Sequence, residues 1–134
     1  MIITQISVFL ENRPGTLAEL VKLLADNGID LKALSIAETP DYGIARLIVD
    51  DTDKAKQIFN ENGWPSKRNH VLQLTVPDEP GSLLKILTAI ADSGVNLEYS
   101  YAFYTKEQGN ASIVMRFHDN DRAIEILKAA GIAD

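Results

Sequence analysis

Side chains capable of covalent or metal chemistry are few in this sequence. There is no cysteine, which excludes disulfides, thiolate metal sites, thiol nucleophiles and thiol redox motifs. The two histidines, His70 and His118, are far apart in the sequence, and neither has a carboxylate or a second histidine at the spacing of metal ligands. They also leave little basis for a Ser-His-Asp arrangement. The sequence therefore predicts no catalytic residues, no metal site and no cofactor.

Two Pro-Gly steps are the features that could bind a ligand. Pro14-Gly15 and Pro80-Gly81 each precede a segment in which apolar residues recur at helical spacing. The first N–H groups of a helix have no partner within it, and together with the helix dipole they can hold a carboxylate. Pro-Gly is also common in turns that bind nothing. Asn12 and Asp78, each two residues before a proline, are suitable as helix caps, so a purely structural interpretation stays open.

The composition is that of an ordinary globular protein. The chain has 134 residues, of which 46% are hydrophobic and 24% charged, enough for one domain or two very small ones. A formal net charge of -6 and a pI near 4.8 disfavour nucleic acid as a partner, because phosphate backbones are repelled. No apolar run approaches the ~20 residues of a membrane span, and the first residues lack a signal-peptide pattern. We expect a cytoplasmic protein with no nucleic acid or membrane partner.

The sequence contains two copies of one pattern. The Pro-Gly steps lie 66 residues apart, and the same offset superimposes further identical residues. They are Leu17 with Leu83, Gly28 with Gly94, Leu31 with Leu97 and Gly43 with Gly109. After a two-residue insertion near 118–120 the offset becomes 68, which pairs Ala55 with Ala123 and Gly63 with Gly131. We place two domains at residues 1–67 and 68–134.

Each copy predicts the element order β-α-β-β-α. In the first copy we expect a strand around 6–10, a helix over 17–24, strands over 30–39 and 42–49, and a second helix capped by Thr52-Asp53. In the second copy we expect a strand around 72–76, a helix over 83–90, strands over 96–105 and 110–117, and a second helix capped within 119–121. This order fits an α+β, ferredoxin-like fold with helices on one face of an antiparallel sheet. The second copy leaves few residues for a fourth strand, which we expect to be short or absent. One unbroken strand over 66–76 could end the first copy and open the second.

The two loops carry a resemblance to a known family. Residues 11–17, ENRPGTL, with 27–31, NGIDL, resemble an ACT domain, and 78–83, DEPGSL, with 93–97, SGVNL, resemble a second one. The match covers nearly the whole chain, and free-standing tandem ACT proteins look like the nearest relatives. The resemblance implies two ferredoxin-like βαββα(β) units. It also implies a regulatory module that binds amino acids where two domains meet and does no chemistry itself.

The resemblance implies ligand-binding residues in both copies. They are Asn12, Gly15, Thr16, Leu17 and Asp30 in the first copy and Asp78, Gly81, Ser82, Leu83 and Asn96 in the second. Serine-binding members place a histidine two residues before the asparagine, where this sequence has Leu10. A zwitterionic amino acid suits the same residues, since helix-start amides can hold its carboxylate and Asp30 or Asn96 can accept from its ammonium. We favour a site that includes the first copy.

Large apolar residues also appear outside the expected cores. In the second copy, strict alternation along one strand places four of them on one face: Leu97, Tyr99, Tyr101 and Phe103. Cross-strand packing and the lining of a pocket are both open interpretations. In the first copy, four others fall on the sheet face without helices: Phe9, Tyr42, Ile44 and Ile48. We expect a homodimer to cover them, because such a face is unfavourable in water.

Together these patterns predict a non-catalytic regulatory or sensor protein. We expect an amino acid or similar small molecule to bind between ACT units and to shift quaternary states that a partner recognises, with a metabolic enzyme as a candidate partner. The alternative is a regulatory subunit that acts on a metabolic enzyme by protein contact alone, without a working ligand pocket. An enzyme is disfavoured, because the sequence contains no nucleophile-base pair and no metal cluster.

Overall fold

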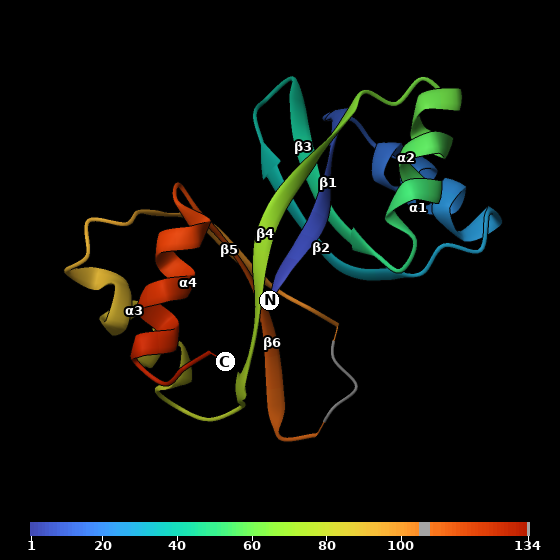
Figure 1. The fold of residues 1–134 in the computed structure, drawn as a ribbon. Coiled ribbons are helices and arrows are strands. Elements are labelled where there is room, and N and C mark those ends of the chain that lie inside the picture. Colours follow the sequence, from blue (N-terminus) through green and yellow to red (C-terminus); the bar gives the residue numbers. More distant parts are fainter. Residues whose placement is uncertain (105–107, 134) are drawn as a thin grey trace. The chain divides into compact units, whose positions relative to one another are not determined.

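The computed structural model describes residues 1–104 and 108–133. The first half of the chain forms β1 (Ile2–Glu11), α1 (Thr16–Asp26), β2 (Leu31–Glu38), β3 (Tyr42–Val49) and α2 (Thr52–Glu61). The second half forms β4 (Ser66–Pro77), α3 (Ser82–Ala91), β5 (Leu97–Ala102), β6 (Asn110–Phe117) and α4 (Asn120–Ala129). The order β-α-β-β-α, predicted twice, is confirmed (Figure 1). Thr105, the end of one predicted strand, lies outside the described residues.

The strands pair in the order β2-β3-β1 in the first half of the chain and β4-β6-β5 in the second half. β3 pairs antiparallel with β1 and β2, and β6 pairs antiparallel with β4 and β5. The predicted α+β class with antiparallel strands is therefore confirmed. The chain divides into two compact units, which are here called the N-terminal unit (Thr4–His70) and the C-terminal unit (Val71–Asp134 with Met1–Ile3). The division falls within β4, three residues after the boundary expected from the repeat.

Each unit has its own hydrophobic core between its strands and its two helices. In the N-terminal unit the alternate β1 residues Ile6 and Val8 are fully buried, as predicted. They pack with residues of β3, α1 and α2: Ala45, Leu47, Val49, Leu20, Leu24, Ala55, Ile58 and Phe59. The C-terminal core repeats the arrangement with Leu72, Leu74, Val76, Ile86, Ile90, Met115, Phe117, Ala123 and Leu127. In both units the helix pair therefore covers a single face of the strands (Figure 1).

A register shift in β5 corrects the predicted aromatic face. Leu97 lies opposite Phe117, but Tyr99 lies opposite Arg116, so the strict alternation breaks between them. Leu97 packs against the C-terminal core, whereas Tyr99 and Tyr101 follow the other face and stack on each other with ring centroids 6.4 Å apart. The prediction that these residues share one face was wrong for Leu97. An extra residue in one strand of a pair reverses the facing of everything after it.

The helices begin differently from the predicted caps. Gly15 and Gly81 are the N-cap residues of α1 and α3, with φ of 86° and 94°, and neither helix has a side-chain cap. This left-handed conformation strains any residue with a Cβ atom. Because no side chain caps either helix, the interpretation of Asn12 and Asp78 as caps was wrong. Asp51, one residue before the predicted Thr52-Asp53, caps α2 through the N–H of Lys54. Asp119 caps α4 through the N–H of Arg122, as predicted.

In each unit a further segment of the chain pairs with the first strand, but the two units take this segment from different parts of the sequence. In the N-terminal unit the chain after α2 takes this place, where the N–H of Phe9 donates to the carbonyl of Pro65 at 2.9 Å. In the C-terminal unit Met1–Ile3 belongs to the same cluster as β4, and the N–H of Gln73 donates to the carbonyl of Met1 at 2.7 Å. Within residues 1–104 and 108–133, no strand follows α4. β4 is a single strand of twelve residues.

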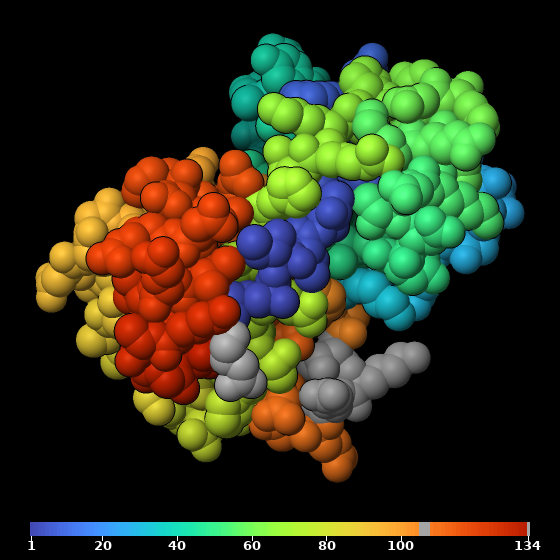
Figure 2. All heavy atoms as spheres, viewed as in Figure 1, coloured from blue at the N-terminus to red at the C-terminus, as the bar shows by residue number. Residues whose placement is uncertain are grey.

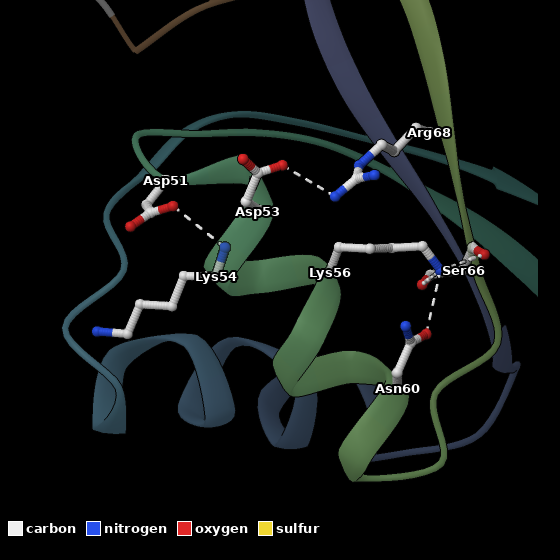
Figure 3. A network of polar contacts seen from close by, with 7 residues as sticks. All are labelled: Asp51, Asp53, Lys54, Lys56, Asn60, Ser66 and Arg68. Atoms are coloured by element: carbon white, nitrogen blue, oxygen red, sulfur yellow. Dashed lines mark hydrogen bonds and ion pairs between the residues drawn. The ribbon is translucent and has the colours of Figure 1, made fainter.

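Polar side chains fasten α2 to the start of β4 (Figure 3). The ammonium of Lys56 donates to the main-chain carbonyl and the hydroxyl of Ser66, each at 2.9 Å, and to Oδ1 of Asn60 at 3.1 Å. Arg68 of β4 pairs with Asp53 of α2 at 2.9 Å. The ammonium of Lys56 therefore donates to three acceptors, one on α2 and two at the start of β4.

Replacing Lys56 with methionine is expected to lower the free energy of unfolding by about 1–2 kcal/mol, because hydrogen bonds to a charged group are among the stronger ones. The matched control is Lys22→Met, whose ammonium pairs with Asp26 on the exposed face of α1 and should change stability by less than ~0.5 kcal/mol. Urea unfolding, followed by the fluorescence of the single tryptophan, Trp64, measures both. Equal losses in the two variants would contradict the role given to Lys56.

Candidate functional site

The loop between β1 and α1 is held by hydrogen bonds to the turn between β2 and β3. The N–H of Asn12 donates to the carbonyl of Asp41 at 3.0 Å, and its side-chain Nδ2 donates to the carbonyl of Thr39 at 2.9 Å. The Oδ1 atom of Asn12 has no hydrogen-bond donor among the described residues. Asn12 is thus fixed in orientation with one acceptor still available.

The first turn of α1 leaves two main-chain donors available beside this loop. Thr16 is nearly buried, and both its N–H and its hydroxyl donate to the carbonyl of Arg13, at 3.3 and 3.1 Å. The first regular helical bond runs from Glu19 to Gly15. No carbonyl within the described residues accepts from the N–H groups of Leu17 and Ala18. Such groups, with the helix dipole, favour a carboxylate.

A cavity of about 220 Å³ opens at this loop. Its walls are Leu10, Glu11, Asn12, Arg13, Thr16, Leu17, Ile36, Glu38 and Gly43. The structure therefore brings Asn12, Thr16 and Leu17 together, three of the residues predicted for the first copy. Drug-sized ligands occupy ~300–1,000 Å³, so this cavity suits a smaller molecule. Glu38 and Ile36 were not predicted as site residues. Their position just before the expected turn at residues 40–41 was the sequence feature that could have indicated them.

Charges surround this cavity on the loop side. Nε of Arg13 donates to Glu11 at 3.0 Å, and the Arg13 guanidinium lies 3.6 Å from Glu19. The hydrogen bond to Glu11 and the charge of Glu19 raise the pKa of Arg13 above its ordinary value. Since these partners already engage Arg13, the carboxylate of Glu38, which also lines the cavity, is the group best suited to an ammonium ion.

Asp30 lies at the other end of the N-terminal sheet. Its N–H donates to the side chain of Asp50 at 3.0 Å, and its carboxylate pairs with Lys32 at 2.8 Å, which raises the pKa of Lys32. β2 runs eight residues from Asp30 to the cavity, a separation of about 25 Å at ~3.3 Å per residue. Within one N-terminal unit, Asp30 therefore cannot share a small ligand with Asn12.

Asn96 occupies the corresponding end of the C-terminal sheet. Its N–H donates to Nδ1 of His118 at 2.9 Å, and its carbonyl accepts from the N–H of His118 at 3.1 Å. The repeat thus places an acceptor side chain opposite the start of the second strand in both units, Asp50 in one and His118 in the other.

The loop between β4 and α3 borders a cavity of about 630 Å³ in the C-terminal unit. Gly81 and Ser82 of the predicted site line it, whereas Asp78 and Leu83 do not. The hydroxyl of Ser82 donates to the carbonyl of Pro77 at 2.6 Å, and the N–H of Asp78 donates to the carbonyl of Gly109 at 2.8 Å. The structure therefore brings only two of the predicted residues of the second copy, Gly81 and Ser82, to this cavity.

Comparison with known proteins identifies the family. The family model described as an ACT domain pair matches residues 1–133. The chain belongs to the ACT domain pair family. The resemblance seen in the two Pro-Gly loops is thereby confirmed. No curated protein matches the sequence.

Solved structures support the same ACT arrangement. A protein from Bacteroides thetaiotaomicron is 38% identical, with a TM-score of 0.91 over 99% of this chain and 91% of that one. The regulatory subunit of aspartate kinase from Thermus thermophilus, in its ligand-free form, is 17% identical, with a TM-score of 0.69 over 99% and 95% of the two chains. The same subunit from Thermus flavus is 16% identical, with a TM-score of 0.66 over 98% and 94%. At these identities the two Thermus proteins show that the fold is shared.

Two further features of this ACT domain pair bear on its chemistry. In the described part of the chain, no group of three or more His, Asp or Glu side chains is arranged to hold a metal ion. None of the helices in that part is long and apolar enough to cross a membrane.

Proposed function

We propose that this ACT domain pair is a non-catalytic regulatory protein that binds an amino acid at the loop between β1 and α1. The observation that carries the proposal is the cavity of about 220 Å³, which Asn12 and Leu17 at the start of α1 both line. Membership of the family supports a regulatory role. So does the shared fold with two proteins named as regulatory subunits.

The cavity suggests how a zwitterion would be oriented. The carboxylate accepts from the N–H groups at the start of α1, which the helix dipole reinforces. The ammonium donates to Oδ1 of Asn12 and to the carboxylate of Glu38. The side chain of the ligand then faces Ile36 and Leu10, which favours an amino acid with a small or apolar side chain.

A second copy of the chain completes this proposal. Phe9 and Tyr42 are 45% and 57% exposed, and Phe9 lies opposite Ile44 in the β1–β3 register on the face away from the helices. Apolar groups gathered in this way favour association. In a homodimer, Asp30 of the second copy is the group that reaches the ligand, since Asp30 of the same copy is too far away. In the C-terminal unit only Gly81 and Ser82 of the predicted residues line the cavity, so the small-ligand site is proposed for the N-terminal loop.

A thermal-shift screen against the twenty amino acids, each at millimolar concentration, tests the function. One amino acid, or a small group alike in size, should raise the melting temperature, since binding to the folded state stabilises it by RT ln(1 + [L]/Kd). A ligand at about 100 times its Kd contributes ~2.7 kcal/mol. The protein concentration must be fixed, because a dimer also gains stability by mass action.

Twenty flat traces would contradict amino acid binding. If a metabolic enzyme then bound the chain with no small molecule present, the protein would act through protein contact alone. Turnover of a substrate by the purified chain would contradict the non-catalytic assignment.

A further inference from the structure

A groove lies at the same place in both units, where the first strand ends beside the first helix. Eight of its lining positions correspond through the repeat, among them Phe9 with Thr75, Glu19 with Lys85, and Trp64 with Ile132. The groove measures about 370 Å³ in the N-terminal unit and about 630 Å³ in the C-terminal unit. The sequence signal for it was the pair Gly63 and Gly131, which follows the second helix in each copy.

The main chain of β4 forms one wall of the larger groove. The N–H of Gln73 points toward Met1, to which it donates at 2.7 Å. In a strand the N–H and C=O of alternate residues point to the same side, so those of Thr75 point the same way. The register of β4 and β6 agrees with this direction. Ser112 of β6 lies opposite Thr75, but its carbonyl accepts from the N–H of Phe103 and therefore points away from β4. Among residues 1–104 and 108–133, no acceptor takes the N–H of Thr75.

In the N-terminal unit the equivalent position beside the first strand is occupied by another segment of the chain. There the residue equivalent to Thr75 is Phe9, and its N–H donates to the carbonyl of Pro65 at 2.9 Å. The segment that begins with Pro65 continues as β4 in extended conformation, and Pro65 is itself a wall of the smaller groove. The occupant of the equivalent position is therefore an extended polypeptide segment.

Charges at the groove differ between the units in a way that favours a partner. In the N-terminal unit Arg13 and Glu19 lie 3.6 Å apart and neutralise each other. At the equivalent positions the C-terminal unit has the reversed charges, Glu79 and Lys85. Neither side chain forms an ion pair within the described residues. Leu84, between them in sequence and lining the same groove, is 66% exposed.

We propose that the groove beside β4 of the C-terminal unit docks an extended segment of a partner protein, which adds as a strand to the edge of β4 at Thr75. The N–H and C=O of Thr75 pair with its main chain, as in other strand additions. An apolar side chain of the segment covers Leu84. An acidic side chain pairs with Lys85 and a basic one with Glu79.

Selection from a random nine-residue peptide library displayed on phage, with the full chain as bait, tests the proposal. The selected peptides should combine an apolar residue with opposite charges, and their affinity should fall at least tenfold with Thr75→Pro. Proline removes an N–H that has no partner, and it is tolerated at strand edges. It also removes the hydroxyl that hydrogen-bonds that of Ser112 at 3.1 Å, a loss that it shares with Thr75→Val, so the two variants should have similar melting temperatures. Thr75→Val, which keeps the N–H, should bind normally. Lys85→Glu should weaken binding of the same peptides.

Hydrogen exchange of the Thr75 amide, measured by NMR in the unmodified chain, gives an independent answer even if Thr75→Pro fails to fold. The amide should exchange rapidly in the chain alone and at least 100-fold more slowly with a selected peptide. Protection without peptide would overturn the proposal, because the chain itself or a second copy would then cover this edge. Sedimentation at several protein concentrations separates those two cases. Absence of binders, or binders indifferent to Thr75→Pro, would also overturn it.

Discussion

Replacing Asn12 with alanine is expected to weaken binding of the amino acid found in the screen by about tenfold or more. Its Oδ1 is an available acceptor in the cavity, and a hydrogen bond to a charged group contributes ~1.5–3 kcal/mol, where ~1.4 kcal/mol is a factor of ten. The variant also loses the bond from Nδ2 to the carbonyl of Thr39, at 2.9 Å, so the loop is held less firmly. Isothermal titration calorimetry measures the loss.

Asn62→Ala is the matched control for this variant. Nδ2 of Asn62 also donates to a main-chain carbonyl, that of Ile58, at 2.9 Å, and the residue lies in the same unit but does not line the cavity. The two variants should lose similar stability, but only Asn12→Ala should lose affinity. Unchanged affinity in Asn12→Ala would show that the ligand, if one binds, lies elsewhere.

Replacing Leu20 with alanine is expected to lower the free energy of unfolding by about 2–5 kcal/mol. Leu20 is fully buried in the N-terminal core, and truncation of such a leucine removes apolar contact and leaves a cavity. Trp64 packs against this core, and it is the single tryptophan of the chain. Its fluorescence during urea unfolding therefore reports on the affected unit.

Leu84→Ala provides the same chemical change at an exposed position. Leu84 is 66% exposed at the start of α3, so the loss should stay below ~0.5 kcal/mol, as for most surface substitutions. A difference of ~2 kcal/mol or more between the two leucines is the expected result. Similar losses would mean that Leu84 is covered in solution, which would bear directly on the partner-docking groove.

The two units show how one backbone pattern can support different contacts. Both Pro-Gly loops place a glycine with positive φ at the start of a helix, and both leave main-chain donors there. The side chains around the loops differ, with Arg13 and Glu19 paired in one unit and their reversed equivalents unpaired in the other. We infer that the N-terminal loop serves the small ligand and that the C-terminal groove serves a partner.

Local patterns were sufficient to predict the element order, the repeat and most of the two cores. These features rest on local signals. Apolar residues at period two, such as Ile6 and Val8, define which side of a strand is buried, and the i, i+3, i+4 spacing does the same for helices. The family also followed from the sequence, because the Pro-Gly loops, helix lengths and strand starts recur together.

The sequence could not place the site residues relative to one another. Asn12 and Asp30 both belong to the predicted set, yet β2 separates them by its whole length. Asn12 and Asp30 are eighteen positions apart in the sequence, and this separation does not define their distance in space until the strands pair. The bonds from Asn12 to Thr39 and Asp41 are likewise invisible in the sequence, since they join segments that meet only when β3 returns beside β1.

Tertiary structure alone decided three further features. The register shift that turns Tyr99 away from Leu97 depends on how two strands pair, which alternation in one strand cannot reveal. The hydrogen bond from Gln73 to Met1 joins residues far apart in the chain, and no local pattern encodes it. The open edge at Thr75 exists for the same reason: whether a strand edge is covered depends on which other segment lies beside it, and non-local pairing is fixed only by the folded chain.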